Sequence, residues 1–180
     1  MAGKWLEILK EAVPDLVEVL VLLHAGNPTA PGYFRAIEKA APSFGLKLVA
    51  AEARNITEVG SAIEPFARTS GRGMVAPPSA LVSTNSRAII GLTAQHRLPA
   101  IYGYPDFVPE GGLMSYGFDR VDDFRQVAIY VDRILRGATP SELPVQAPTK
   151  FELIINLKTA KALGLTISEA FLLRADQVIE

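Results

Sequence analysis

The chain has 180 residues, of which 49% are hydrophobic and 21% charged, and its formal net charge at pH 7 is -1. This composition excludes an intrinsically disordered chain, and 18 basic against 19 acidic residues give no basic surface for nucleic acid. The lack of cysteine excludes disulfides and thiolate metal sites, and two histidines, His24 and His96, are too few for a His-rich centre. We expect one domain, or one and part of another, without a metal or cofactor.

The N-terminal segment has no signature of membrane insertion or secretion. No apolar run in the chain approaches the ~18 residues that a transmembrane helix needs. Residues 1–13 read MAGKWLEILKEAV, where Glu7, Lys10 and Glu11 interrupt the apolar core of a signal peptide. As written, the chain is expected to stay where it is made, or to be a piece of something longer.

The predicted elements alternate between helix and strand up to residue 104. Apolar residues recur at helical spacing over 4–13, and the apolar run at 17–23 suits a strand buried on both faces. The same alternation predicts further helices at 33–44, 56–67 and 79–95 and further strands at 46–51, 73–76 and 99–102. Joined by right-handed crossovers, these elements give an α/β fold with an open parallel sheet flanked by helices.

After Tyr104, prolines and glycines break this alternation. A short strand is expected at 113–116, followed by a helix at 120–136 of about four turns. One face of that helix carries an apolar stripe, which consists of Val121, Phe124, Ala128, Val131 and Leu135. Three prolines in 138–149 predict an extended linker. The chain is expected to close with a strand at 151–156 and short helices at 159–163 and 170–178.

A candidate binding site follows from the sheet itself. Ligands of open parallel sheets bind beyond the carboxyl ends of the strands. That rule selects Asn27 and Thr29 after the first strand, Ser79 after the third, and Gly103 and Tyr104 after the fourth. Asn and Ser form hydrogen bonds, Tyr stacks, and Gly lets a ligand approach the backbone. The same residue types are also ordinary turn formers, and the pattern alone leaves both interpretations open.

No pattern of catalytic residues indicates an enzyme. The serines after the third strand lack the nucleophile elbow of hydrolases, and His24 has no visible partner. The sequence GRG at 71–73 lacks the lysine and the further glycine of phosphate and dinucleotide loops. His24 is interpreted as a polar cap on a strand end and His96 as a cation at a helix C-terminus.

Several stretches of the sequence resemble the solute-binding proteins of ABC transporters, in particular the tryptophan/tyrosine-type group. They are GKWLEILKEAVP at 3–14, the Asn-Pro pair at 27–28, HRLPAIYGYPDFVPEGGLMSYG at 96–117 and YVDRILRGATPSELPVQAPTKFELIINLKTAKALGLTI at 130–167. The resemblance spans nearly the whole chain and is weakest over 53–82. It corresponds to the second half of a usual member, which begins with a signal peptide and a first lobe.

The resemblance implies the type I periplasmic binding fold, in which two α/β lobes joined by hinge strands close on a ligand. Residues 1–104 are then expected to form the ligand-binding second lobe. Residues 105–150 correspond to a crossover segment and linker that belong to the first lobe. Residues 151–180 correspond to a hinge strand and closing helices that pack on the second lobe.

The resemblance also carries ligand contacts onto particular positions. They fall on Asn27 in the Asn-Pro loop, on Ser79, on Tyr102–Tyr104, and on Ser115, Tyr116 and Gly117 with Asp119. Of these positions, Asn27, Ser79, Gly103 and Tyr104 lie in loops that the sheet rule selects independently. Family members often carry an acidic or amide residue after the third strand, where this chain has the uncharged sequence MVAPPSALV.

The function implied by the resemblance is that of a truncated, non-enzymatic solute-binding component of an ABC uptake transporter. Such a component binds a small molecule, for example an amino acid, in the periplasm and delivers it to a permease. A chain without a signal peptide would be cytoplasmic if Met1 is the natural start. The alternatives are an effector-sensing module of a regulatory protein, a remnant with weak or no ligand binding, and a flavodoxin-like enzyme, which lacks the polar cluster it would need.

A missing first lobe has a consequence for the helix at 120–136. Its apolar stripe would lose its natural cover, at a cost of roughly 1.5–3 kcal/mol for each large exposed residue. Either the helix folds back on the chain's own sheet or a second copy covers it. We expect a homodimer, and exchange of the C-terminal segments is one way to form it. A single lobe presents half a cleft, so ligand binding is expected to be weak unless the dimer rebuilds the other half.

Overall fold

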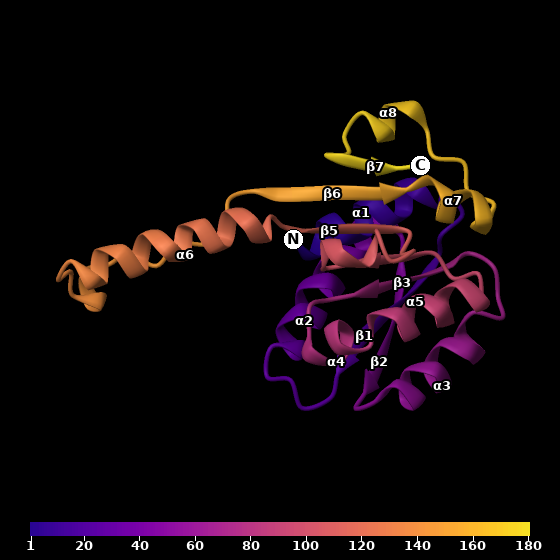
Figure 1. The fold of residues 1–180 in the computed structure, drawn as a ribbon. Helices are drawn as coiled ribbons and strands as arrows, with labels where there is room; N and C mark the ends of the chain where they lie inside the picture. Colours follow the sequence, from indigo (N-terminus) through magenta and orange to yellow (C-terminus); the bar gives the residue numbers. More distant parts are fainter.

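The predicted strands assemble into one sheet in the computed structural model, which describes all residues 1–180 (Figure 1). The seven strands have the order β2-β1-β3-β4-β5-β6-β7. Every neighbouring pair is parallel except β5 and β6, which run antiparallel. The strands are β1 Glu18–His24, β2 Lys47–Ala53, β3 Arg72–Ala76, β4 Ala100–Tyr102, β5 Met114–Phe118, β6 Phe151–Asn156 and β7 Gln177–Ile179.

Helices cover both faces of this sheet. The α-helices are α1 Ala2–Ala12, α2 Ala30–Ala40, α3 Ile56–Phe66, α4 Ala80–Thr84, α5 Ser86–Gln95, α6 Arg120–Leu135, α7 Leu157–Leu163 and α8 Glu169–Leu172. Three short 3₁₀ turns are η1 Ala41–Phe44, η2 Pro105–Phe107 and η3 Pro140–Glu142. The cores on the two faces draw on different helices: α1, α2, α7 and α8 contribute to one, and α3, α4 and α5 to the other.

Strand β1 shows why the apolar run predicts a doubly covered strand. Its side chains alternate between the two cores, with Val19 and Val21 in one and Leu20 and Leu22 in the other. All four are at most 1% exposed. A strand with helices on both faces therefore has no solvent side that would require a polar residue.

Two of the predicted helices are wrong in extent. The helix expected at 79–95 is two helices, because the backbone leaves helical geometry at Asn85 (φ -121°, ψ 26°). The helix expected at 170–178 ends with α8 at Leu172, and its remainder includes strand β7. Asp176 causes this change: its amide donates to the Leu153 carbonyl (2.9 Å), and its carboxylate accepts from the Leu153 amide (2.7 Å), which places β7 beside β6.

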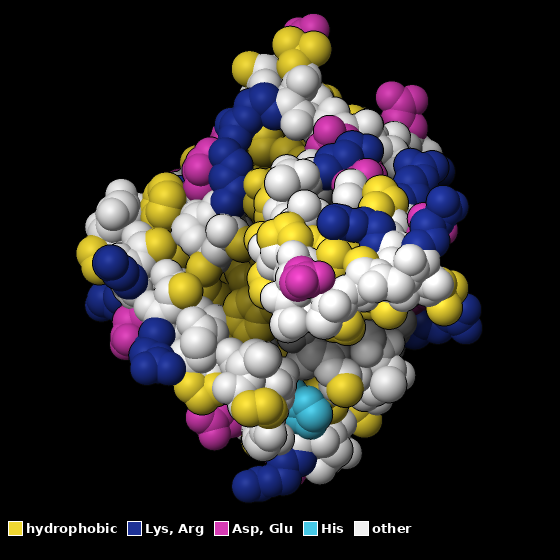
Figure 2. All heavy atoms as spheres, turned by 90° about the vertical axis from the view of Figure 1, so that its left-hand side faces the viewer, with side chains coloured by type: hydrophobic (Ala, Val, Ile, Leu, Met, Phe, Trp, Pro, Cys, Tyr) yellow, Lys and Arg dark blue, Asp and Glu magenta, His cyan; other side chains and the backbone are white.

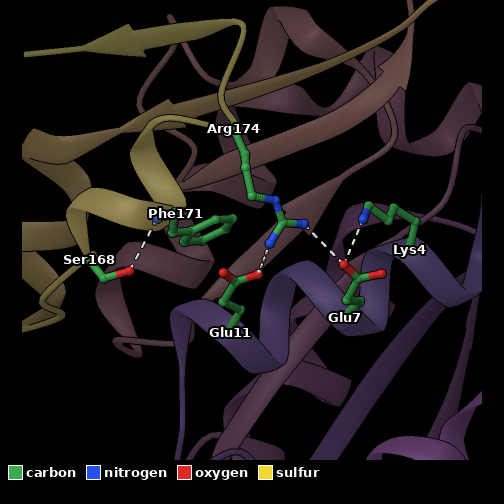
Figure 3. A network of polar contacts seen from close by, with 6 residues as sticks. All are labelled: Lys4, Glu7, Glu11, Ser168, Phe171 and Arg174. Carbon is green, nitrogen blue, oxygen red and sulfur yellow. Dashed lines mark hydrogen bonds and ion pairs between the residues drawn. The ribbon is translucent and has the colours of Figure 1, made fainter.

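The C-terminal segment is attached to the first helix by a polar network (Figure 3). The Arg174 guanidinium bonds Glu7 (3.0 Å) and Glu11 (2.6 Å) on α1, and Glu7 also accepts from Lys4 (2.6 Å). Beside this network, Phe171 is 1% exposed, and its backbone amide donates to the Ser168 hydroxyl that caps α8. The two ends of the chain therefore close over the same core.

One part of the chain stands apart from the rest. We call residues 119–150 the arm, because α6 and the following linker extend away from the sheet in Figure 1. The remaining residues, 1–118 and 151–180, are called the body. No residue of α6 is buried, and the main tie between helix and linker is a hydrogen bond from the Tyr130 hydroxyl to the Pro144 carbonyl. No helix of the chain is long and apolar enough to cross a membrane.

Candidate functional site

The carboxyl ends of β1, β3, β4 and β5 lie at one end of the body, since these strands are parallel. The loops that follow them are Ala25–Thr29, Pro77–Ser79, Gly103–Tyr104 and the start of the arm at Asp119. We call this end the carboxyl edge. Figure 2 shows it face on, with hydrophobic side chains at the floor of a recess among polar ones. The sheet therefore gathers most of the predicted site loops at one place.

The loop after β1 is held by its own side chains. The Asn27 Oδ1 accepts from the Thr29 amide (3.0 Å) and from the Thr29 hydroxyl (2.9 Å), which forms an Asx turn before α2. Thr29 is exposed and Asn27 is partly exposed. The Asn27 amide nitrogen donates to no protein group, so it is available to a ligand. A hollow of about 500 Å³ opens beside it and is shared with Phe34 and Arg35.

The loops after β3 and β4 pack closely against each other. Ser79 is 9% exposed and caps α4, where its hydroxyl oxygen accepts from the Val82 amide (3.2 Å). A Cβ atom at Gly103 would lie only 2.4 Å from the Pro78 Cδ. Gly103 therefore has a packing reason to be glycine, since any side chain would force the two loops apart. The hydroxyl proton of Ser79 has no acceptor in the protein.

The two neighbouring tyrosines have different positions. Tyr102 is fully buried, its hydroxyl lies 3.0 Å from the Thr93 hydroxyl of α5, and its ring stacks on Phe107 with centroids 4.4 Å apart. Burial raises the pKa of this phenol. Its side chain is thus a core group of the body, directed to α5 and not to the carboxyl edge.

Tyr104 is half-buried and lies at the carboxyl edge. Its ring is nearly parallel to that of Phe107, with centroids 6.4 Å apart. Burial raises the pKa of the Tyr104 phenol, the nearby Tyr33 phenol raises it further, and the Arg120 guanidinium opposes both. Arg120, at the start of the arm, lines the same hollow as Tyr104, which follows β4.

The predicted residues on β5 lie inside the sheet. Ser115 is 0% exposed, and its hydroxyl is a buried group without a hydrogen-bond partner. The Tyr116 ring stacks on Phe151 (5.7 Å), and its carbonyl accepts from the Trp5 indole (2.7 Å). A Cβ at Gly117 would meet the Gly103 carbonyl at 2.5 Å. Ser115 and Gly117 therefore hold β5 in place within the sheet, whereas Tyr116 is half-buried.

Asp119 joins the two points where the chain enters and leaves the arm. Its carboxylate caps α6 by accepting from the Val121 amide (2.9 Å) and the Asp122 amide (3.1 Å). It also accepts from the Lys150 ammonium (2.6 Å), and the Asp119 amide donates to the Lys150 carbonyl (3.0 Å). The hydrogen bond from Lys150 is the main cause that lowers the pKa of Asp119, and the pKa of Lys150 is raised in return.

The sequence pattern missed a group of polar residues beside Tyr104. A hollow of about 300 Å³ is lined by Tyr104, Asp106, Arg120 and residues of α4 and α5. The Arg120 guanidinium pairs with Asp106 (2.5 Å) and so bridges the arm to the loop after β4. Asp106 could have been found, because it lies in the same strand-following loop as Tyr104. Tyr33 and Arg120 could not, because each lies inside a predicted helix.

Comparisons with known proteins agree with this fold. The family described as ABC transporter substrate binding protein matches residues 1–179. A conserved domain protein from Vibrio cholerae O1 biovar eltor is similar in structure, with 30% identity and a TM-score of 0.90 over 98% of this chain and 60% of that chain. No curated protein matches the sequence.

Two further solved structures are similar in fold. An ABC domain from Streptococcus pneumonia in complex with L-Trp has 22% identity and a TM-score of 0.90, over 99% of this chain and 60% of that chain. A ligand-free, open substrate-binding protein with adhesive properties from Clostridium difficile has 21% identity and a TM-score of 0.72, over 98% and 59%. The chain thus spans about 60% of the length of the structures that it resembles.

Proposed function

The chain belongs to the family of ABC transporter substrate-binding proteins, and we propose that it binds a small molecule at the carboxyl edge as the solute-binding component of an uptake system. One observation carries this proposal: loops from three parallel strands bring unsatisfied polar groups to one end of the sheet, next to a half-exposed aromatic ring. Such a site is suited to binding, since it holds no paired nucleophile and base. We infer a permease partner and a periplasmic location from membership of this family.

We assign different roles to the predicted site residues. Asn27, Thr29, Ser79 and Tyr104 contact the ligand, and Gly103 allows the loops around them to pack closely. Four residues act behind the site: Tyr102, Ser115 and Tyr116 support the strands, and Asp119 fixes the start of the arm. For Tyr102 and Ser115 this division rests on exposure, because both are 0% exposed whereas Tyr104 is half-buried. For Tyr116 it rests on the stacking of its ring on Phe151.

The ligand class that fits best is an amino acid with an apolar or aromatic side chain. Tyr104, backed by Phe107, provides a flat surface for such a side chain. The Arg120 guanidinium lines the same hollow as Tyr104, and its N–H groups that are not bonded to Asp106 can bind a carboxylate. The loop after β3 carries no charge for an ammonium group. The bound L-Trp of the Streptococcus pneumonia structure supports the same class.

We further propose that the arm belongs to the opposite lobe of the binding fold. We set the boundary after residue 118 instead of the expected 104, and the pairing of β5 with β4 and β6 supports this choice. The chain leaves the body at Asp119 and returns through Lys150 into β6, so the ion pair between these residues lies at the hinge.

The arm also supports a homodimer. Phe124 is 67% and Leu135 81% exposed on the apolar stripe, and nothing in the chain covers them. Helix α6 begins with the acidic pair Asp122 and Asp123 and carries Arg133 in its last turn. Two α6 helices packed antiparallel would therefore match apolar stripes and place opposite charges side by side.

Light scattering tests the dimer. At tens of micromolar the chain is expected to be a dimer, and Val131→Asp is expected to give a monomer with unchanged helix content, because a buried charge opposes association. Arg125→Ala, on the same helix but outside the stripe, serves as the control. A monomeric wild-type chain would overturn the proposed dimer. The proposal that the chain binds a ligand would still stand, because a separate experiment tests it.

Calorimetric titration with L-Trp and a panel of apolar amino acids tests ligand binding. A single lobe encloses only part of a ligand, so a dissociation constant on the order of 0.1–1 mM is expected. Tyr104→Ala should weaken binding about tenfold or more, because an aromatic contact is lost. Tyr130→Ala on the arm is the matched control. The proposal fails if no member of the panel binds, or if Tyr104→Ala and Asn27→Ala leave the affinity unchanged.

A further inference from the structure

A third hollow lies at the end of the body opposite the carboxyl edge. It has a volume of about 330 Å³ and lies between α5 and α7, which Figure 1 shows at the end of the body away from the arm. A volume of this size falls at the lower end of small-molecule sites. Its walls are mainly apolar, and they include Ala94, Leu98, Ala100, Leu113, Ala162 and Leu163.

The hydroxyl groups of the walls already have hydrogen-bond partners. The Tyr102 and Thr93 hydroxyls lie 3.0 Å apart, and the Thr93 hydroxyl bonds the Ile90 carbonyl (3.0 Å). On the α7 side, the Thr159 hydroxyl donates to the Gly111 carbonyl (2.9 Å). A ligand that enters the hollow therefore gains most of its binding free energy by burying apolar surface.

Two cationic side chains border the hollow. They are Arg97, just after α5, and Lys158, in the first turn of α7, and no acidic residue lines the hollow. Neither side chain takes part in an ion pair, whereas several other basic residues of the body do. Both are exposed, so they can reorient toward a bound anion. The site thus offers positive charge beside an apolar interior.

The backbone at Arg97 provides an independent observation. Arg97 is the one non-glycine residue of the chain with a positive φ, at 49°. Its amide donates to the Ala94 carbonyl (3.1 Å), and the Leu98 amide donates to the Thr93 carbonyl (2.8 Å), which is the helix-ending motif that glycine usually completes. An arginine at such a position is strained, and strain of this kind concentrates at functional sites.

We propose that the hollow between α5 and α7 binds a small carboxylate with a short apolar chain. The chain lies against the walls of the hollow, and Arg97 and Lys158 hold the carboxylate at its border. This site is separate from the amino-acid site at the carboxyl edge, because the sheet lies between them.

Calorimetric titration with octanoate tests the proposal on the full chain. The expected dissociation constant is on the order of 0.1–1 mM, and octanol and acetate should bind about tenfold more weakly, since each lacks one of the two recognised parts. Amide NMR shifts should change at residues 93–98 and 158–163 and not at 25–29. Octanoate that shifts only the carboxyl edge, or that gives no shift or heat at about 5 mM, would overturn the proposal.

Variants distinguish octanoate binding in this hollow from a nonspecific attraction of octanoate to the positive surface charge. Arg97→Gly and Lys158→Ala should each weaken octanoate binding about tenfold, because each removes one charge-assisted contact. Arg97→Gly should not lower the melting temperature, since glycine adopts the positive φ without strain. Lys161→Ala, also on α7 but outside the hollow, is the control for charge. If all three variants retain wild-type affinity, or Lys161→Ala loses as much as the others, the assignment is wrong.

Discussion

The body and the arm use similar apolar residues to opposite effect. In the body, Trp5, Leu9 and Phe107 are at most 2% exposed, and both faces of the sheet are covered by helices. In the arm, Val121, Phe124 and Leu135 are more than half exposed, although α6 is the longest helix of the chain. Regular apolar spacing therefore fixes the helix, while burial depends on whether a partner surface is available.

The same difference shows where the stability of the molecule resides. The body holds its elements by burying side chains, whereas α6 relies on helix capping by Asp119, on the ion pair between Arg136 and Asp132, and on a few contacts with the linker. Such local interactions contribute a few tenths of a kcal/mol each up to about 1 kcal/mol. The arm is thus expected to lose structure before the body.

The largest expected effect comes from replacing one phenylalanine in the body and one in the arm, which compares burial in the two regions. Phe107→Ala in the body should lower the free energy of unfolding by about 3–5 kcal/mol, because it empties a site stacked on Tyr102. Phe124→Ala in the arm should change it by less than about 0.5 kcal/mol under dilute, monomeric conditions. Urea denaturation followed by circular dichroism measures both. Equal losses at the two positions would show that the arm is packed on the body in solution.

Two glycines sharpen the contrast at the level of the backbone. A methyl group at Gly117 would press on the Gly103 carbonyl at 2.5 Å, whereas one at Gly137 meets nothing within 4 Å. Gly117→Ala should cost about 1–3 kcal/mol, because β4 and β5 would have to separate. Gly137→Ala should cost the arm about 1–2 kcal/mol, through its positive φ alone, and should leave the unfolding of the body unchanged. The order of the two losses in urea denaturation decides whether the body is the more crowded region.

The junction between body and arm should respond to acid. Because the folded pKa of Asp119 is lowered by Lys150, the pair stabilises the junction fully above the unfolded pKa, about 3.9, and loses its effect as the pH falls through the folded pKa. NMR shifts of the Val121 and Asp122 amides should report this loss. Asp119→Asn keeps a capping side chain and should abolish the pH dependence. An unchanged acid transition in that variant would assign it to another group.

The smallest expected effect compares two exposed arginines. Arg174→Ala removes the contacts to Glu7 and Glu11 and should lower the stability of the body by about 0.5 kcal/mol, an effect that added salt reduces. Arg136→Ala removes a pair within the arm and should leave the unfolding of the body unchanged. Urea denaturation at low and high salt measures both. A loss that is insensitive to salt would indicate that Arg174 acts through its packing on Phe171.

Sequence alone predicted the body well because its strands are short apolar runs with helices between them. It missed the break at Asn85 and strand β7, since both depend on side-chain to backbone bonds that have no periodic signal. At the proposed site, the selection of Asn27, Ser79 and Tyr104 followed from strand order and polarity and stays a prediction. They could not separate Tyr102 from Tyr104, because the direction of each ring is set by Phe107 and Thr93 in the folded core.

Trp5 is the one tryptophan of the chain and is fully enclosed by the body. Its indole donates to the Tyr116 carbonyl (2.7 Å) and lies 5.9 Å from the Tyr33 ring. The intrinsic fluorescence of the protein therefore comes from a dry, hydrogen-bonded indole, and its emission should shift to longer wavelength only when α1 separates from β5. A fluorescence melt would follow the body alone, and its divergence from a helix-sensitive signal would directly reveal early melting of α6.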